Sequence, residues 1–194
     1  RTPDWFGDDP VGRVFNGFTK ETDYGFVFGG PLIQDRLFFF VNYDRFHQGA
    51  PGADIGGSPL GRTPPGITQA NLDAAVAAAV GYGMEPGTLD STGDLDLEEY
   101  AIKLDWNIND DHRASFRYSH LDQSKLRING FNSSQASLSS YWYQHNKTVD
   151  SYVGQLFSDW SDNFSTEVKV SFRDYSAIRA VPTNDPSVRV NFGS

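Results

Sequence analysis

The chain has no cysteine, no apolar run long enough to form a membrane-spanning helix, and few cations for its size. Without cysteine, thiolate catalysis, cysteine-ligated zinc and disulfide bonds are excluded. A spanning helix needs about 18 consecutive apolar residues, so any insertion into a membrane must use strands. The 16 Lys and Arg against 25 Asp and Glu give a formal net charge of -9, and this balance offers no electrostatic support for binding nucleic acid.

Residue types that carry catalysis or bind metals are present but dispersed. The histidines match neither a zinc site nor a Ser-His-Asp triad; they are His47, His112, His120 and His145. An acidic stretch lacks the EF-hand spacing and favours a solvated loop over a calcium site; it contains Asp90, Asp94, Asp96, Glu98 and Glu99. We therefore predict that the chain is not an enzyme and holds no cofactor or metal, while calcium in loop 90–99 stays open.

Aromatic residues make up 14% of the chain, a large share of the 38% that are hydrophobic. Aliphatic residues are correspondingly few. Three blocks, 24–46, 99–121 and 151–175, alternate apolar and polar residues on either side of a short polar turn. Period-two alternation around a turn is typical of an antiparallel hairpin. We predict an all-β, antiparallel, up-and-down arrangement of about six strands in three hairpins.

The alternation separates each predicted strand into two faces. The candidate lipid-facing residues are Tyr100, Ile102, Leu104, Trp106, Phe116, Tyr118, Val168, Val170 and Phe172. The candidate lumen-facing residues are Lys103, Asp105, Arg113, Arg117, Glu167, Lys169 and Arg173. The second group can contact a ligand or a plug, or can form a mutually paired lining with no ligand role, and the paired lining is favoured.

Connections between the hairpins are long, covering residues 47–98 and 122–150, whereas the turns within hairpins are short. Glycine and proline at 29–31 are expected to end the first strand, because proline offers no donor to the ladder. Phe38 and Phe40 are apolar on the polar face, which predicts that a plug or another element covers them. One short helix is predicted in the first connection, with Thr68 as N-cap and Gly81 at its end.

Alternation alone fits a soluble sandwich as well as a membrane barrel, but three features favour the barrel. Segments of about ten residues, tilted near 40°, reach about 25 Å, the height of a lipid-facing band. Aromatic residues lie near the ends of the apolar faces, where membrane interfaces favour them. Short turns alternate strictly with long loops, as in outer-membrane barrels, whose long loops are extracellular.

Residues 29–46, GGPLIQDRLFFFVNYDRF, resemble a conserved motif of Oar-like TonB-dependent outer-membrane receptors. Residues 99–120 and 156–175 are similar to the next two hairpins of that family, in family order. The resemblance implies a barrel of some 22 strands, filled by an N-terminal plug and energised from the inner membrane through TonB. We expect residues 1–194 to be part of that barrel domain, with the plug and remaining strands absent.

The resulting prediction is ligand uptake or exchange across the outer membrane of a Gram-negative bacterium. Its expected partners are outer-membrane lipid, the TonB complex through the missing plug, and an unknown extracellular ligand. The alternative is a secreted β-rich binding module with carbohydrate as a candidate ligand, in which Tyr141, Trp142 and Tyr143 stack on sugar rings. Those three residues fit more readily an aromatic cluster that closes the loop or starts a strand.

Overall fold

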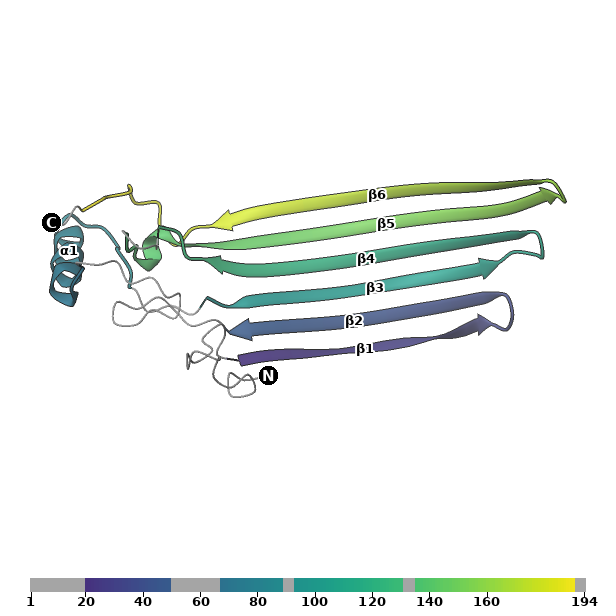
Figure 1. Cartoon of the computed structure of the whole chain (residues 1–194), viewed down its shortest axis with the longest axis horizontal. Coiled ribbons are helices and arrows are strands. Elements are labelled where there is room, and N and C mark those ends of the chain that lie inside the picture. Colours follow the sequence, from purple (N-terminus) through teal and green to yellow (C-terminus); the bar gives the residue numbers. More distant parts are fainter. Residues whose placement is uncertain (1–19, 50–66, 89–92, 131–134, 191–194) are drawn as a thin grey trace, which may run out of the picture.

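The computed structural model describes residues 20–49, 67–88, 93–130 and 135–190, and Figure 1 shows a single sheet of long strands. All six pair antiparallel with their neighbours in sequence, in the order β1-β2-β3-β4-β5-β6. They are β1 (Lys20–Ile33), β2 (Leu37–Gly49), β3 (Leu95–Asn107), β4 (His112–Arg127), β5 (Tyr143–Ser161) and β6 (Phe164–Ala180). The predicted all-β, up-and-down arrangement of three hairpins is confirmed.

The short turns lie together at one end of the sheet, which we call the turn end; the longer connections lie at the other, the loop end (Figure 1). The turns cover residues 34–36, 108–111 and 162–163. In the second turn the Asn109 side-chain oxygen accepts hydrogen bonds from the backbone amides of Asp111, at 3.0 Å, and His112, at 2.8 Å. This local bonding is why asparagine favours tight turns.

The strands are longer than the alternation predicts. They run from 13 residues in β2 and β3 to 19 in β5, against the expected ten or so. Parts of the connections expected at 47–98 and 122–150 therefore belong to strands. The pattern ends early because polar side chains occupy both faces near the loop end, while the backbone ladder continues without needing an apolar face.

The expected end of the first strand at 29–31 is wrong. β1 continues to Ile33, and its register shifts only between Pro31 and Ile33. A Cβ on Gly29 would lie 2.9 Å from the Phe39 carbonyl oxygen, so glycine permits the close approach of β2. Pro31 is tolerated because the register shift follows it directly, and proline is found at such irregularities.

The helix α1 (Gln69–Gly81) lies in the connection between β2 and β3, as predicted. Thr68 is its N-cap, and the Thr68 hydroxyl accepts a hydrogen bond from the Asn71 amide at 3.3 Å. Gly83, just past the end, has a left-handed φ of 78°, the conformation in which glycine commonly follows a helix. Neither α1 nor any other helix within the described ranges has the length and apolar character needed to cross a bilayer.

No second layer of described residues covers the sheet. Among the described residues, Trp142 is the one buried large hydrophobic side chain, at 1% exposed. It packs against Leu126, Ile128 and Ala136 at the loop end, and its indole nitrogen donates to the Ser137 hydroxyl at 2.7 Å. The small core of the described chain therefore belongs to the β4–β5 connection and leaves both faces of the sheet bare.

That core is joined to the connection after α1. The Ser139 amide donates to the Thr88 carbonyl at 2.8 Å, and the Thr88 amide donates to the Ser139 hydroxyl at 3.0 Å. Ser139 belongs to the 3-10 turn η2 (Ser139–Tyr141), directly before Trp142. Two connections that are distant in sequence are thus held together at the loop end.

We predict that Trp142→Ala opens the β4–β5 connection, because truncating a buried Trp typically costs about 3–5 kcal/mol. Limited proteolysis mapped by mass spectrometry should show faster cleavage between residues 128 and 142. Tyr82→Ala is the matched control, since Tyr82 is 86% exposed and its loss should leave the cleavage rate unchanged. Equal acceleration by both substitutions would contradict the role given to Trp142.

Candidate membrane-facing and charged surfaces

The strand register sorts the predicted site residues onto opposite faces of the sheet. One face, which we call the aromatic face, carries all nine candidate lipid-facing residues, aligned through pairs such as Ile102 with Tyr118 and Leu104 with Phe116. The same face continues onto β2 with Phe39 and Val41 and onto β5 with Tyr152. The other, the charged face, carries all seven candidate lumen-facing residues, as in the pairing of Lys103 with Arg117.

The aromatic face is bare in the middle of the sheet as well as at its edges. Ile102 on β3 is 42% exposed and Phe116 on β4 is 44% exposed, although both strands have neighbours on either side. On the edge strand β6, Val170 reaches 68%. Such values arise because none of the described residues packs over these side chains, whereas a core position would be almost fully enclosed.

A row of rings crosses the aromatic face toward the loop end. Tyr118 contacts Tyr100 at 6.0 Å and Tyr152 at 4.9 Å between ring centroids, and Tyr152 contacts Phe172 at 6.2 Å. We call these four residues the tyrosine row. The Tyr118 hydroxyl donates to the Asp150 carboxylate at 2.7 Å, so its polar tip points away from the apolar band and toward the loop end.

A second group of rings closes the apolar band at the turn end. The Trp160 indole nitrogen donates to the Thr166 hydroxyl at 2.9 Å, and the Trp160 ring lies 5.0 Å from that of His112. Tyr152 and Trp160 are eight residues apart on β5, which is roughly 26 Å along a strand. At a tilt near 40° this spans about 20 Å, close to the height of the apolar band of an outer-membrane barrel.

Beyond the tyrosine row the aromatic face becomes polar and largely acidic. Among the described residues, ion pairs there join Arg45 to Glu98 at 3.5 Å, His47 to Asp96 at 2.9 Å and His120 to Asp150 at 2.9 Å. The predicted solvated loop is wrong for Asp96 and Glu98. They lie in β3 instead, and their partners on β2 are register neighbours, which only the strand pairing could show.

The charged face carries little internal pairing. Lys103 and Asp105 form an ion pair at 2.8 Å, and the Gln155 amide donates to Glu167 at 3.2 Å. Arg113 lies over the Phe157 ring at 4.6 Å. Within the described ranges no ion pair involves Arg117, Lys169 or Arg173.

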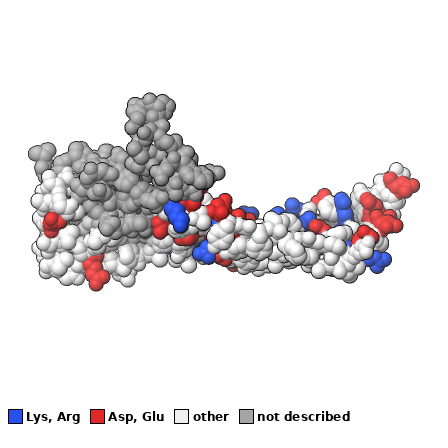
Figure 2. All heavy atoms as spheres, turned by 90° about the horizontal axis from the view of Figure 1, so that it is seen from below, with Lys and Arg blue, Asp and Glu red and all other residues white. Residues whose placement is uncertain are grey.

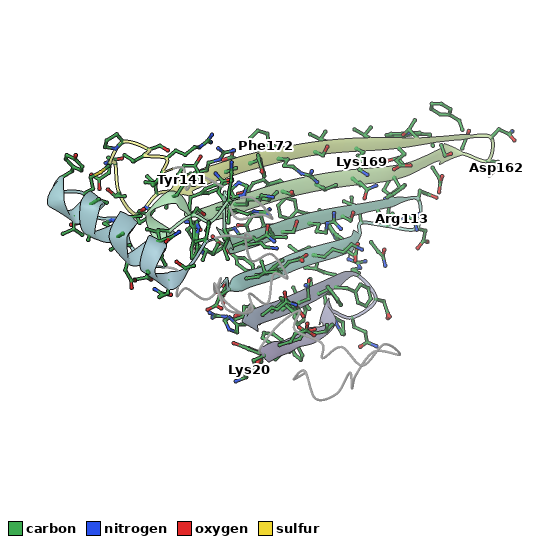
Figure 3. All side chains as sticks on the ribbon, turned by 60° about the vertical axis from the view of Figure 1, so that its left-hand side comes forward. Lys20, Arg113, Tyr141, Asp162, Lys169 and Phe172 are labelled. Atoms are coloured by element: carbon green, nitrogen blue, oxygen red, sulfur yellow. The ribbon has the colours of Figure 1, made fainter. Side chains whose placement is uncertain are left out.

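The separation of charged from uncharged side chains can be followed in the figures. Figure 2 views the sheet from its lower edge in Figure 1; over the middle of the sheet, blue and red atoms gather along one side and the opposite side is mostly white. Figure 3 shows side chains standing on both sides of the sheet, with Arg113 and Lys169 in its turn half and Tyr141 at the loop end. Phe40, 42% exposed, is an apolar exception on the charged face.

The remaining candidate residues do not form a site. Trp142 is buried and Tyr143 begins β5, so these two of the loop aromatics close the loop and start a strand. No cluster of histidine and carboxylate side chains in the described ranges has the arrangement of a metal site. Asp90, the first residue of the acidic stretch, lies outside the described residues.

Comparison with known proteins adds no relative: no family model matches the chain, and neither the curated proteins nor the solved structures contain a match.

We predict that Tyr118→Phe lowers the stability of the sheet in lipid or detergent, because the Asp150 carboxylate loses one of its two side-chain donors. Tyr152→Phe is the matched control, since the Tyr152 ring lies in the same row and its hydroxyl forms no hydrogen bond with another described residue. Urea unfolding followed by tryptophan fluorescence should give a lower midpoint for Tyr118→Phe alone. A lower midpoint for Tyr152→Phe only would contradict this account.

Proposed function

We propose that the chain is part of the β-barrel of an outer-membrane receptor of the TonB-dependent, Oar-like kind, with the aromatic face toward lipid and the charged face toward the lumen. The observation that carries the proposal is an apolar band on one face of a single-layer sheet, bordered by rings at both ends. The proposed protein takes up or exchanges a ligand across the outer membrane and does not catalyse a reaction.

The energetics of the aromatic face support lipid as its solvent. Burying one large apolar side chain is worth about 1.5–3 kcal/mol. Half of that for each of the nine residues sums to roughly 10 kcal/mol, which is comparable to the whole free energy of unfolding of an ordinary domain. A sheet with this face in water would lose that stabilisation, which is as large as its expected free energy of unfolding.

The two edges of the sheet support a larger closed structure. β1 and β6 each pair on one side only, and lipid cannot satisfy the free amides and carbonyls of an edge strand. Further strands on both sides would satisfy them by closing a barrel. The resemblance of residues 29–46 to the Oar-like motif agrees with this and names the family to which those strands would belong.

The partners of the proposed receptor follow from the two faces. Lipid contacts the aromatic face, with the hydroxyl of Tyr118 and the indole of Trp160 at the two interfaces. A plug supplied by the rest of the protein covers Phe38 and Phe40 on the charged face and links the barrel to the TonB complex. The ligand arrives at the loop end, which is extracellular in this orientation.

We predict that Leu104→Arg damages assembly in the outer membrane by up to about 2–4 kcal/mol, the cost of a cation at the bilayer midplane, whereas Lys103→Leu is far milder. The two positions are adjacent on β3 and point to opposite faces, so each controls for the other. Assembly is measured on the full protein in cells, by heat-modifiable gel migration of isolated outer membranes.

Equal damage from the two substitutions would reject the assignment of faces. A full protein that is recovered from the medium as a compact, water-soluble monomer, with Leu104 protected from solvent, would reject the receptor and favour a secreted binding module.

A further inference from the structure

The cations of β4–β6 are segregated on one face. All eight Lys and Arg of these strands lie on the charged face, and the aromatic face of the same strands carries none. The eight are Arg113, Arg117, Lys125, Arg127, Lys147, Lys169, Arg173 and Arg179. They are half of all the Lys and Arg in a chain whose formal net charge is -9. Positive charge is therefore concentrated on this face although the chain as a whole is acidic.

Their positions form a ladder along the strands. The register defines eight successive rows across the charged face, from the row of Arg113 near the turn end to the row of Arg127 at the loop end. Seven of the eight rows carry at least one Lys or Arg; the exception holds Leu121, Val149 and Tyr175. Adjacent rows are two residues apart, roughly 7 Å, so the cations are closely and almost evenly spaced.

Carboxylates on the same strands do not neutralise this ladder. The charged face of β4–β6 carries only Asp159 and Glu167, both near the turn end, whereas Asp122, Asp150 and Asp174 lie on the aromatic face. Lys125, Lys147 and Arg179 form no ion pair with any residue in the described ranges. Burial, together with the nearby cations Lys147, Arg127 and Arg179, lowers the pKa of His145, which lies in the ladder well beyond the tyrosine row.

Two of the guanidinium groups lie over aromatic rings. The Arg113 Cζ is 4.6 Å from the Phe157 ring centroid, near the turn end, and the Arg179 Cζ is 5.0 Å from the Tyr143 ring centroid, near the loop end. A guanidinium in contact with a ring can still donate two parallel hydrogen bonds to a carboxylate or a phosphate. The ladder therefore has, near each of its two ends, a guanidinium group that can bind an anionic group.

We propose that the charged face of β4–β6 is a binding track for anionic solutes that carry several phosphate or carboxylate groups, leading from the loop end toward the turn end. The inference rests on the proposed function, because it assigns the ligand class of the proposed receptor. Lipid phosphates do not reach this surface, since it lies on the opposite side of the sheet from the aromatic face.

The test uses the full protein purified from outer membranes, with inorganic tripolyphosphate as the probe, a compact polyanion able to contact adjacent rows. Binding is measured by isothermal titration calorimetry at low and at high salt. The ladder variant combines Arg117→Gln, Lys147→Gln and Arg173→Gln. The matched control combines Lys20→Gln, Arg45→Gln and Arg189→Gln, which remove the same charge from residues outside the ladder.

We expect the unsubstituted protein to bind tripolyphosphate, more weakly at high salt because ions screen exposed pairs. The ladder variant should lose at least about tenfold in affinity, since each lost contact is a charge-assisted hydrogen bond, and the control should stay near the original value. Equal loss in both variants overturns the track. Absence of binding by the unsubstituted protein also overturns the track, even if the cause is that an acidic segment of the protein already covers the ladder.

Heat-modifiable migration of the same samples is scored separately from binding. An assembled barrel that does not bind overturns the anionic track and leaves the proposed receptor standing. A protein that binds tripolyphosphate through the ladder but shows no heat-modifiable migration rejects the receptor barrel and keeps the anion-binding surface.

Discussion

The structure depends on what covers the aromatic face, because no second layer of described residues packs on the sheet. Hydrogen bonds between adjacent strands hold the backbone in register, but they do not decide what touches Ile102 or Phe116 on that face. Both side chains are more than two fifths exposed in the middle of the sheet. In the proposed receptor, lipid would cover the whole band at once, and the rings at its two borders would lie where a membrane meets water.

The alternation in the sequence was sufficient to predict the faces and the hairpins. Ile102, Leu104 and Trp106 repeat at every second position, and strict alternation can place them only on one side of a strand. The turn at Asn109 was also readable, because asparagine bonds to the backbone amides that follow it. Class, strand order and the division into two faces therefore follow from local residue patterns.

The ends of the strands and the partners across them could not be read in the same way. Near the loop end both faces are polar, as at Asp122, Gln123 and Ser124, so hydrophobic periodicity disappears although the backbone ladder continues. The pairing of His47 with Asp96 joins residues 49 positions apart, and no local pattern records such a distance. The ladder of cations could not be predicted from the sequence for the same reason, because its rows combine residues of three strands.

The strands also differ in length in a systematic way. β1, β2 and β3 have 13 or 14 residues, whereas β4, β5 and β6 have 16 to 19. The register brings the loop ends of β2–β6 close to a single row, which runs through Gln48, Leu95, Lys125, His145 and Arg179. The additional residues of β5 and β6 therefore lie at the turn end, where the third hairpin projects beyond the other two (Figure 1).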